Sequence, residues 1–295
     1  MGRKSTLSSF EFQAPLRKFV NVKHSQIWKH RILRPIERLG FLYTGSSKKA
    51  LRRFIERLHP QTTNIPLIRM GGGQDGGYLL PDDLDGIAAL FSPGVDQNSA
   101  FEADALGRGM VVHLADASVE EPASGIAGLP GVHFRKEFVG ARERTDRLSF
   151  QDWVKESSVD DQSDLMAQID IEGAEYEVLL DATPELLSRF RVLVIEFHSV
   201  EWWASPGMFQ VVEAAIGRLL ETHRVVHAHP NNWMGTKTVQ GVELPPLIEL
   251  TFHRRDRAEF QGYASQIPHP LDAPNASSRP EVVLPRNWWG GPKGR

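Results

Sequence analysis

The sequence predicts an α/β fold in which helices wrap a parallel sheet. From about residue 87 onward, short apolar runs rich in Val, Ile and Leu alternate with segments of helical periodicity, a pattern typical of strands that are buried on both faces. The helical segments begin and end with residues that cap helices. With 295 residues, 41% of them apolar and 24% charged, the chain has the balance of one large globular domain with appendages.

Two elements are expected before the sheet. An amphipathic helix should run from Ser47 to near His59-Pro60, because apolar residues recur there at helical spacing. A hairpin should follow, formed by residues 67–70 and 78–80 around the glycine-rich segment 71–77. The apolar residues of the helix are Leu51, Phe54, Ile55 and Leu58.

Seven apolar runs are the expected strands of the sheet, and capping residues mark the helices between them. The strands are Ile87–Ser92, Met110–Ala115, Val132–Phe134, Leu165–Ile171, Val192–Phe197, Arg224–Ala228 and Leu247–Phe252. The helices are Asn98–Arg108, one capped by Ser149 with Asp152 three residues later, one opened by Thr183-Pro184, and Met208–Thr222 behind Ser205-Pro206.

Composition excludes several kinds of chemistry. The chain has no cysteine, so disulfides, thiolate nucleophiles and iron–sulfur clusters are ruled out. No apolar run approaches the roughly 20 residues of a membrane-spanning helix, and the first residues, Met-Gly-Arg-Lys-Ser-Thr, lack the apolar stretch of a secretory signal. We therefore expect a soluble, cytoplasmic protein whose chemistry comes from His, Asp, Glu, Tyr or a cofactor.

Charge divides the chain unevenly. Residues 1–60 carry 14 Lys and Arg against 3 Asp and Glu, a net +11, and the remainder carries 20 against 34, a net −14. The expected parts are a basic helical arm over residues 1–64, a Rossmann-like domain over 65–266 and a tail with Pro, Gly and Trp over 267–295. A solvated helix face is the simplest interpretation of the arm; contact with an anionic membrane surface is its candidate function, and no nucleic-acid partner is expected.

Candidate ligand-binding residues follow the first two strands. In an open parallel sheet, ligands bind at the carboxyl ends of the strands, near the point where the strand order reverses. Gly94 lies in the turn after the first strand, where a glycine lets the backbone approach a ligand. Asp116 follows the second strand, where an acid accepts hydrogen bonds from ribose hydroxyls. The alternatives are a tight turn at Gly94 and an Asp116 that caps the next turn.

Acids and imidazoles follow strands four to six. Asp170 and Glu172 end the fourth strand, Glu196 and His198 the fifth, and His227 and His229 the sixth. Buried carboxylates require a cation, a ligand or hydrogen-bond donors. We therefore expect these side chains to converge on one site, although a single His is more often structural.

At this point the sequence resembles a known family. Residues 168–179, Gln-Ile-Asp-Ile-Glu-Gly-Ala-Glu-Tyr-Glu-Val-Leu, are similar to the Asp-x-Glu-Gly-x-Glu stretch of FkbM-type methyltransferases. The resemblance covers about residues 65–255. It implies a Rossmann-like class I methyltransferase fold, a seven-stranded, mostly parallel sheet with an antiparallel last strand and helices on both faces. It also implies S-adenosylmethionine as the cofactor, and O-methylation of a sugar, glycolipid or natural product.

By this resemblance the Gly94 loop holds the methionine part of the cofactor, Asp116 binds its ribose, and Asp170 lies near the transferred methyl. The first motif of the family, Asp-x-Gly-Ala-x-x-Gly, is replaced here by Ser92-Pro93-Gly94-Val95-Asp96, which has one glycine. Asp75, Glu102 or the glycine-rich hairpin is therefore expected to compensate for the missing glycines. The expected cofactor-binding residues are Gly94, Asp96, Glu102, Asp116, Ser118 and Asp75.

Two mechanisms remain open at this stage. A hydroxyl acceptor needs a base, for which His198 or His229 is the candidate, oriented by Glu196 or Asp170. Alternatively, a divalent cation held by Asp170, Glu172, Glu196 and His198 would acidify the hydroxyl; this ligand set suits Mg or Mn.

Two rival functions remain as well. Asp170-Ile171-Glu172 is readable as the metal-binding acids of a glycosyltransferase that uses a nucleotide sugar, but Gly94 and Asp116 would then have no role. A non-catalytic module that binds phosphate or nucleic acid through the basic arm is the other alternative, and salt-dependent binding would identify it. Hydrolases are excluded, because no Gly-x-Ser-x-Gly, His-Glu-x-x-His or Walker motif is present.

Overall fold

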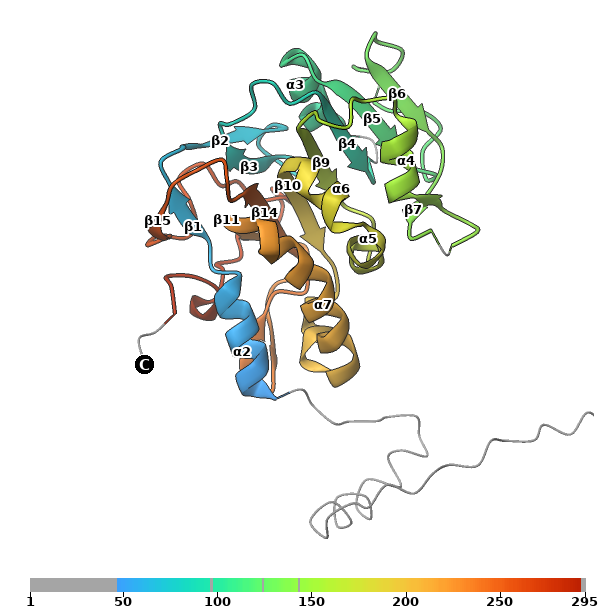
Figure 1. Cartoon of the computed structure of the whole chain (residues 1–295). Helices are drawn as coiled ribbons and strands as arrows, with labels where there is room; N and C mark the ends of the chain where they lie inside the picture. Colours follow the sequence, from blue (N-terminus) through green and yellow to red (C-terminus); the bar gives the residue numbers. More distant parts are fainter. Residues whose placement is uncertain (1–46, 96–97, 124, 143, 293–295) are drawn as a thin grey trace, which may run out of the picture. The chain divides into compact units, whose positions relative to one another are not determined.

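The computed structural model describes residues 47–95, 98–123, 125–142 and 144–292, and its centre is a seven-stranded sheet (Figure 1). All seven predicted strands are present in this sheet. Its order is β11-β14-β10-β9-β4-β5-β6. The strands are β4 (Ala89–Pro93), β5 (Val111–Ala115), β6 (Val132–Arg135), β9 (Leu165–Ile169), β10 (Phe190–Phe197), β11 (His223–Pro230) and β14 (Ile248–Arg254).

The direction of the strands confirms the predicted fold class. β4 pairs in parallel with β5 and β9, β5 with β6, and β9 with β10. The last strand, β14, lies antiparallel between β10 and β11. The chain builds outward from β4 to β6 and then returns to β9 on the other side of β4. The strand order therefore reverses between β4 and β9, where such sheets bind ligands.

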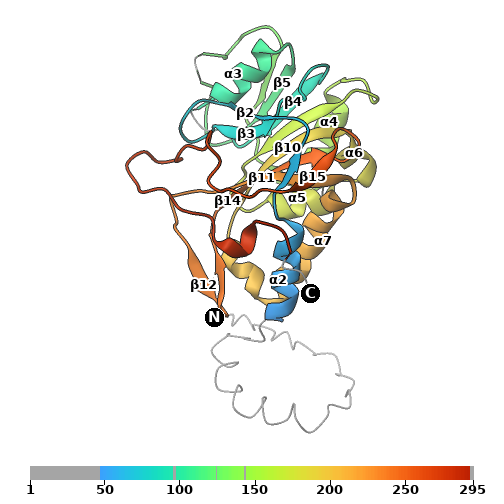
Figure 2. The same ribbon diagram turned by 90° about the vertical axis from the view of Figure 1, so that its left-hand side faces the viewer.

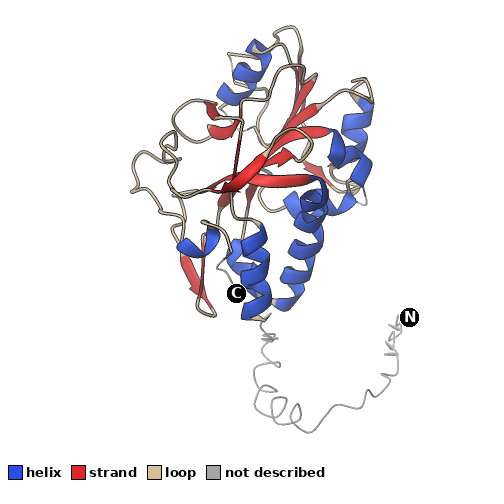
Figure 3. Cartoon of the chain, turned by 60° about the vertical axis from the view of Figure 1, so that its left-hand side comes forward, coloured by secondary structure: helices blue, strands red, loops and turns tan. Residues whose placement is uncertain are grey.

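Helices cover both faces of the sheet (Figure 3). Side chains alternate across each strand, so that Leu193 and Ile195 of β10 belong to one core and Val192 and Val194 to the other. The first core is shared with α2 (Lys48–Arg57), α4 (Phe150–Glu156), α5 (Glu175–Asp181), α6 (Pro184–Arg189) and α7 (Pro206–Thr222). The second is shared with α3 (Ala100–Gly107) and the hairpin of β2 (Leu67–Met70) and β3 (Tyr78–Pro81).

Two of the predicted helix starts are confirmed by capping hydrogen bonds, and a third by its proline. The Ser149 hydroxyl accepts a hydrogen bond from the Asp152 amide at 3.2 Å, and the Thr183 hydroxyl accepts one from the Leu186 amide at 3.3 Å. α7 begins with Pro206, directly after Ser205. Local sequence chemistry therefore sets these three boundaries.

Several strands end one or two residues away from the predicted position, and two of these differences concern candidate site residues. β9 ends at Ile169 rather than Ile171, because Glu172 and Gly173 adopt φ angles of 55° and 102°, which no strand tolerates. β11 continues to Pro230 instead of ending at Ala228, since its pairing with β14 persists to that residue. His229 therefore lies within a strand and not in a loop that follows it.

The flanking segments pack on the same unit as the sheet (Figure 2). Leu51, Phe54 and Ile55 of α2 are buried in the first core, and Trp288 of the tail is buried against Trp203 with ring centroids 5.8 Å apart. β1 (Gln61–Thr63) pairs with β15 (Phe260–Tyr263). The remaining short elements are β7 (Val139–Gly140), β8 (Leu148–Ser149), η1 (Val200–Ala204), β12 (Lys237–Val239), β13 (Val242–Leu244) and η2 (Arg286–Trp288).

Most of the predicted basic arm, residues 1–46, lies outside the described residues, so its boundary and its partners stay predictions. Within the described ranges, no helix is long and apolar enough to cross a membrane.

Candidate functional site

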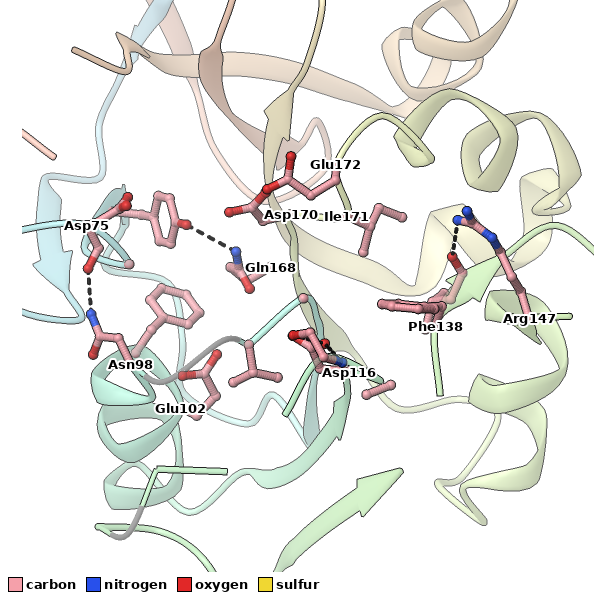
Figure 4. A pocket seen from close by; sticks show the side chains of 18 residues that line it. Asp75, Asn98, Glu102, Asp116, Phe138, Arg147, Gln168, Asp170, Ile171 and Glu172 are labelled. Carbon is pink, nitrogen blue, oxygen red and sulfur yellow. Dashed lines mark hydrogen bonds between the residues drawn. The ribbon is translucent and has the colours of Figure 1, made fainter. Parts of the chain in front are cut away.

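A pocket of about 680 Å³ opens at the carboxyl ends of β4, β5 and β9 (Figure 4). This is the point where the strand order reverses. Side chains from the hairpin β2–β3 and from α3 close one side, and the segment around β7 and β8 closes the other. Its walls include Asp75, Tyr78, Gly94, Asn98, Glu102, Asp116, Ser118, Phe138, Arg147, Gln168, Asp170 and Glu172.

Gly94 is required by the contact between β4 and β9. Its φ angle is +84°, and a Cβ atom there would lie 1.5 Å from the carbonyl oxygen of Asp170. The Asp170 amide in turn donates a hydrogen bond to the Pro93 carbonyl at 3.2 Å. No side chain fits between the two strand ends, so Gly94 gives the pocket its floor.

Asp116 caps the turn that follows β5 and also lines the pocket. Its Oδ1 atom accepts hydrogen bonds from the Ser118 amide at 2.7 Å and the Ser118 hydroxyl at 2.6 Å, which is the turn-capping alternative. Asp116 and Ser118 also line the pocket beside the end of β5. The turn therefore fixes the carboxylate at the pocket wall.

Glu175 organises the turn that follows β9, a role that the sequence analysis missed. Its side chain is fully buried, and Oε1 accepts hydrogen bonds from the amides of Ile171 at 3.2 Å and Gly173 at 3.0 Å. The same oxygen lies 3.0 Å from Nδ1 of His198. Three hydrogen bonds thus converge on one carboxylate oxygen. The third acid of the Asp-x-Glu-Gly-x-Glu pattern thus folds back on the first two.

His198 is surrounded by acids on both ring nitrogens. Nδ1 faces Glu175, while Nε2 lies 3.3 Å from Glu172 Oε2 and 3.8 Å from Asp170 Oδ1. Burial alone would lower the pKa of His198, but the hydrogen bond to Glu175 and the nearby carboxylates raise it to about 9. His198 is therefore an imidazolium at neutral pH; its Nδ1 donates to Glu175, and its Nε2 forms ion pairs with Glu172 and Asp170.

Asp170 lies in the pocket wall (Figure 4), and its Oδ1 is 3.8 Å from Nε2 of this imidazolium. Burial raises the pKa of Asp170 to about 7; the His198 charge opposes this rise, and the acids Glu175, Glu172 and Asp75 add to it. A carboxyl that titrates near neutral pH is suited to accept a proton from a substrate. Of the predicted catalytic residues, Asp170 is the one that lines the pocket.

Glu196 and His229 are not among the residues that line the pocket, so the side chains that follow strands four to six do not all converge on it, although Glu196 lies close to Asp75. Glu196 faces Glu249 across the β10–β14 pairing and accepts a hydrogen bond from Asn231 at 3.0 Å. His229 lies between Glu249 at 3.3 Å and Glu281 of the tail at 2.9 Å. Hydrogen bonds and charges from these acids raise the pKa of His229 to about 9, although burial opposes this rise. His229 is thus paired on both nitrogens under the tail.

The predicted metal set divides for the same reason. Among the described residues, one group of candidate ligands is Asp170, Glu175 and His198, and another is Asp75, Glu196 and Glu249, each with its atoms within 4.8 Å of one another. Glu196 points to the face of β10 that the hairpin covers, whereas His198 follows the end of that strand. Asp170, Glu172, Glu196 and His198 therefore do not form a single site.

The other predicted cofactor contacts are brought together. Asp75, Gly94, Glu102, Asp116 and Ser118 all line the pocket, while Asp96 lies outside the described residues. The sequence analysis missed Tyr78, Phe138, Arg147 and Gln168. Gln168 could have been predicted from the sequence, because it lies two residues before Asp170 and the alternation of side chains along a strand puts both on one face.

Comparisons with known proteins give fold-level similarities only. No family model matches the chain, and no curated protein matches it, so membership of the FkbM family stays a prediction. Among solved structures, the chain is similar to 1,6-didemethyltoxoflavin-N1-methyltransferase of Burkholderia thailandensis, which holds its substrate and S-adenosylhomocysteine. The identity is 14%, the TM-score 0.30, and the match covers 82% of this chain and 94% of that one.

Two further structures are similar at comparable levels. A fibrillarin/Nop5p complex matches 67% of this chain and 98% of its own, with 9% identity and a TM-score of 0.35. A protein of Streptococcus thermophilus described as a hemolysin matches 63% of this chain with 10% identity and a TM-score of 0.32. The chain spans 64% of that protein's length. At these values no function is transferred, and the fold assignment rests on the strand order above.

Replacing Glu175 with Gln should lower the pKa of His198 from about 9 to below about 8, because a neutral amide no longer stabilises the imidazolium. The measurement is NMR titration of the His198 ring, identified by its loss in a His198→Gln protein. Glu177→Gln is the matched control on the same helix, since Glu177 lies near Arg144 and Arg147 instead. An unchanged His198 pKa in Glu175→Gln would contradict the assigned pairing.

Proposed function

We propose that the chain is an S-adenosylmethionine-dependent methyltransferase that transfers the methyl group to a hydroxyl of a small-molecule or glycan acceptor. The observation that carries this proposal is the pocket at the reversal point of the sheet, which gathers Gly94, Asp116 and Asp170. Each of these follows a different strand, and each has the chemistry expected of its position. A pocket of about 680 Å³ also has the size of a cofactor site.

The charge of the pocket favours this cofactor. The described lining residues include five acids, Asp75, Glu102, Asp116, Asp170 and Glu172, and one basic residue, Arg147. S-adenosylmethionine carries a positive sulfonium, which acidic walls attract. A nucleotide sugar carries a diphosphate, which the same walls repel. The pocket therefore supports methyl transfer over the rival glycosyltransferase function.

When bound, the cofactor supplies an electrophilic methyl carbon, to which the acceptor oxygen bonds as the carbon–sulfur bond breaks and its electron pair stays on sulfur. Asp170 accepts the proton of the acceptor hydroxyl, since its carboxyl titrates near neutral pH and faces the pocket. His198 acts through Asp170: its positive charge keeps a useful fraction of the carboxyl ionised. His198 is thus a positioning residue and not the base.

The acceptor class rests on the resemblance to FkbM-type enzymes. Stacking of a sugar on an aromatic side chain is compatible with Phe138, which lines the pocket and is 53% exposed. Trp202 and Trp233 are exposed but are not among the lining residues, and Arg279 lies 4.5 Å from the centre of the Trp233 ring. Trp203 is excluded from this role, because it is buried in the core. A divalent cation is not required by this mechanism, since Asp170 itself removes the proton.

The first test is calorimetric titration with S-adenosylhomocysteine in the presence and absence of Mg. We expect binding to the wild-type chain that is independent of Mg. Binding to Asp116→Asn should be at least about tenfold weaker, since the amide loses the charged acceptor for the ribose hydroxyls while Oδ1 still caps the turn. Asp256→Asn is the control, because Asp256 follows β14, whose antiparallel direction puts its carboxyl end at the end of the sheet opposite the pocket.

Absence of binding to the wild-type chain would refute the proposal. Equal affinity of wild type and Asp116→Asn would remove Asp116 from the ribose site.

The second test concerns the base. In assays of methyl transfer to a panel of sugars and hydroxylated natural products, Asp170→Asn should lower kcat by about 10²–10⁴-fold. Glu172→Gln, in the same turn but with an 88% exposed side chain, should have a much smaller effect. Wild-type kcat should rise with pH through about 7, where Asp170 loses its proton. In His198→Gln this rise should move to higher pH. If kcat of Asp170→Asn still rises with pH through about 7, a residue other than Asp170 is the base.

A further inference from the structure

A chain of hydrogen bonds crosses the floor of the pocket from α3 to the hairpin. Ser92 Oγ lies 2.5 Å from Glu102 Oε1 and 2.8 Å from Gln168 Oε1. Gln168 Nε2 donates to the Tyr78 hydroxyl oxygen at 3.1 Å. Glu102, Ser92, Gln168 and Tyr78 are all buried, and they come from four different elements of the fold.

Counting the protons along this chain of hydrogen bonds shows which group donates in each bond. A hydroxyl has one proton, yet Ser92 lies within hydrogen-bond distance of two oxygens. The amide oxygen of Gln168 has no proton to offer, so Ser92 donates to it. The contact between Ser92 and Glu102 then needs a proton from Glu102, which must be a neutral carboxylic acid in this arrangement.

Ionisation of Glu102 would reverse the whole chain. Ser92 would have to donate to the Glu102 carboxylate, and the Gln168 amide would have to turn over so that its nitrogen donates to Ser92. The Tyr78 hydroxyl would then donate its hydrogen bond to the Gln168 oxygen. The protonation state of Glu102 thus decides whether the Tyr78 hydroxyl is available as a donor in the pocket.

We propose that Glu102 is protonated in the ligand-binding form of the pocket and is a positioning residue, which holds the Tyr78 hydroxyl as a donor to the carboxylate of the bound cofactor. This inference rests on the proposed function. It gives a role to two buried groups that methyl transfer itself does not use, and it makes cofactor affinity depend on a proton held at the far end of the chain.

Three features of the pocket support this assignment. Glu102 Oε2 is buried without a hydrogen-bond partner among the described residues, which is costly for an ionised carboxylate. Burial raises the pKa of Glu102 to about 7, against the opposing effect of the Ser92 hydrogen bond. The other charged groups that line the pocket are mostly acids, so Glu102 has no basic neighbour within the described part of the chain that would favour its ionised form: Asp75, Asp116, Asp170 and Glu172, with Arg147 on the far wall.

The surroundings of Tyr78 also favour the donor orientation. Burial and the charges of Asp170, Glu249, Glu196 and Asp75 raise its pKa well above 10, so the phenol keeps its proton. These neighbours are acceptors. The described pocket has few other donors for a ligand carboxylate, because the amides of Asn98 and Gln168 already donate to Asp75 and Tyr78.

The test is the pH dependence of S-adenosylhomocysteine binding, measured by calorimetry at pH 6 and pH 8 for wild type and Glu102→Gln. The Gln side chain still donates a hydrogen bond to Ser92, but unlike the Glu102 carboxyl it does not titrate. Because Asp170 titrates in both proteins, the ratio of their Kd values isolates Glu102. Because the pKa of Glu102 is about 7, the Kd of wild type divided by the Kd of Glu102→Gln should rise about tenfold from pH 6 to pH 8. Asp104→Asn, on the same helix, is the control and should follow the wild type.

A double-mutant cycle separates a role through Tyr78 from a direct contact. In a Tyr78→Phe background, Glu102→Gln should leave the pH dependence unchanged, because the chain no longer ends in a donor. Tyr78→Phe should also weaken binding of S-adenosylhomocysteine but not of 5′-methylthioadenosine, which lacks the amino-acid end. A ratio that stays constant while Tyr78 is present, or one that still changes in the Tyr78→Phe background, would overturn the inference.

Failure of the inference is distinguishable from failure of the proposed function. If the wild-type chain binds no S-adenosylhomocysteine at either pH, the proposed function fails. The protonation state of Glu102 is then measured in the free protein by infrared difference spectra, wild type minus Glu102→Gln. At pH 6, a carbonyl band of a protonated carboxylic acid supports the proposed row of hydrogen bonds, and a carboxylate band overturns it.

Discussion

The contact between Gly94 and Asp170 is the constraint on which the pocket depends. β4 and β9 are far apart in the sequence and adjacent in the sheet, and their ends meet so closely that the Asp170 carbonyl occupies the place of a Gly94 side chain. The Gly94 amide also donates to the Ala115 carbonyl at 3.0 Å, which ties the same residue to β5. All three strands that carry the pocket are therefore joined at one glycine, and the acids that follow β5 and β9 face each other across it.

The second feature of the molecule is a polar row on the sheet face that the hairpin and the tail cover. Strict alternation places Ser92, Gln168, Glu196 and Glu249 on this face, and all are buried. Burying such groups is costly unless each finds a partner. The partners come from outside the sheet: Asn275 of the tail donates to Glu249 at 2.5 Å and to Asp75 at 3.1 Å, and Tyr78 accepts from Gln168. Glu196 keeps its pKa well above the usual range, because burial and the neighbouring acids disfavour its charge. The hairpin and the tail are thus parts of the site's support.

Local sequence patterns predicted the sheet and several residues that line the pocket, and failed where contacts with distant segments determine the structure. The seven strands, the caps at Ser149 and Thr183, and the positions of Gly94, Asp116 and Asp170 follow from periodicity and from the rule that ligands bind at strand ends. The expected role of His229 failed because pairing with β14 extends β11 by two residues, and because Glu281 of the tail covers the ring. His198 and Glu196 separate since β10 ends between them. The roles of Glu175 and Tyr78 depend on contacts with residues 23 and 90 positions away, which no local pattern contains.

The central claim, that this pocket holds S-adenosylmethionine in a fixed orientation, is tested most directly by a crystal structure of the chain with S-adenosylhomocysteine. The account predicts the ligand in the pocket between Gly94, Asp116 and Asp170. Its ribose hydroxyls should lie within hydrogen-bond distance of the Asp116 carboxylate, its amino-acid end against Tyr78, and its sulfur on the side of Asp170. A ligand bound at another place, or in this pocket with its ribose away from Asp116, would contradict the account.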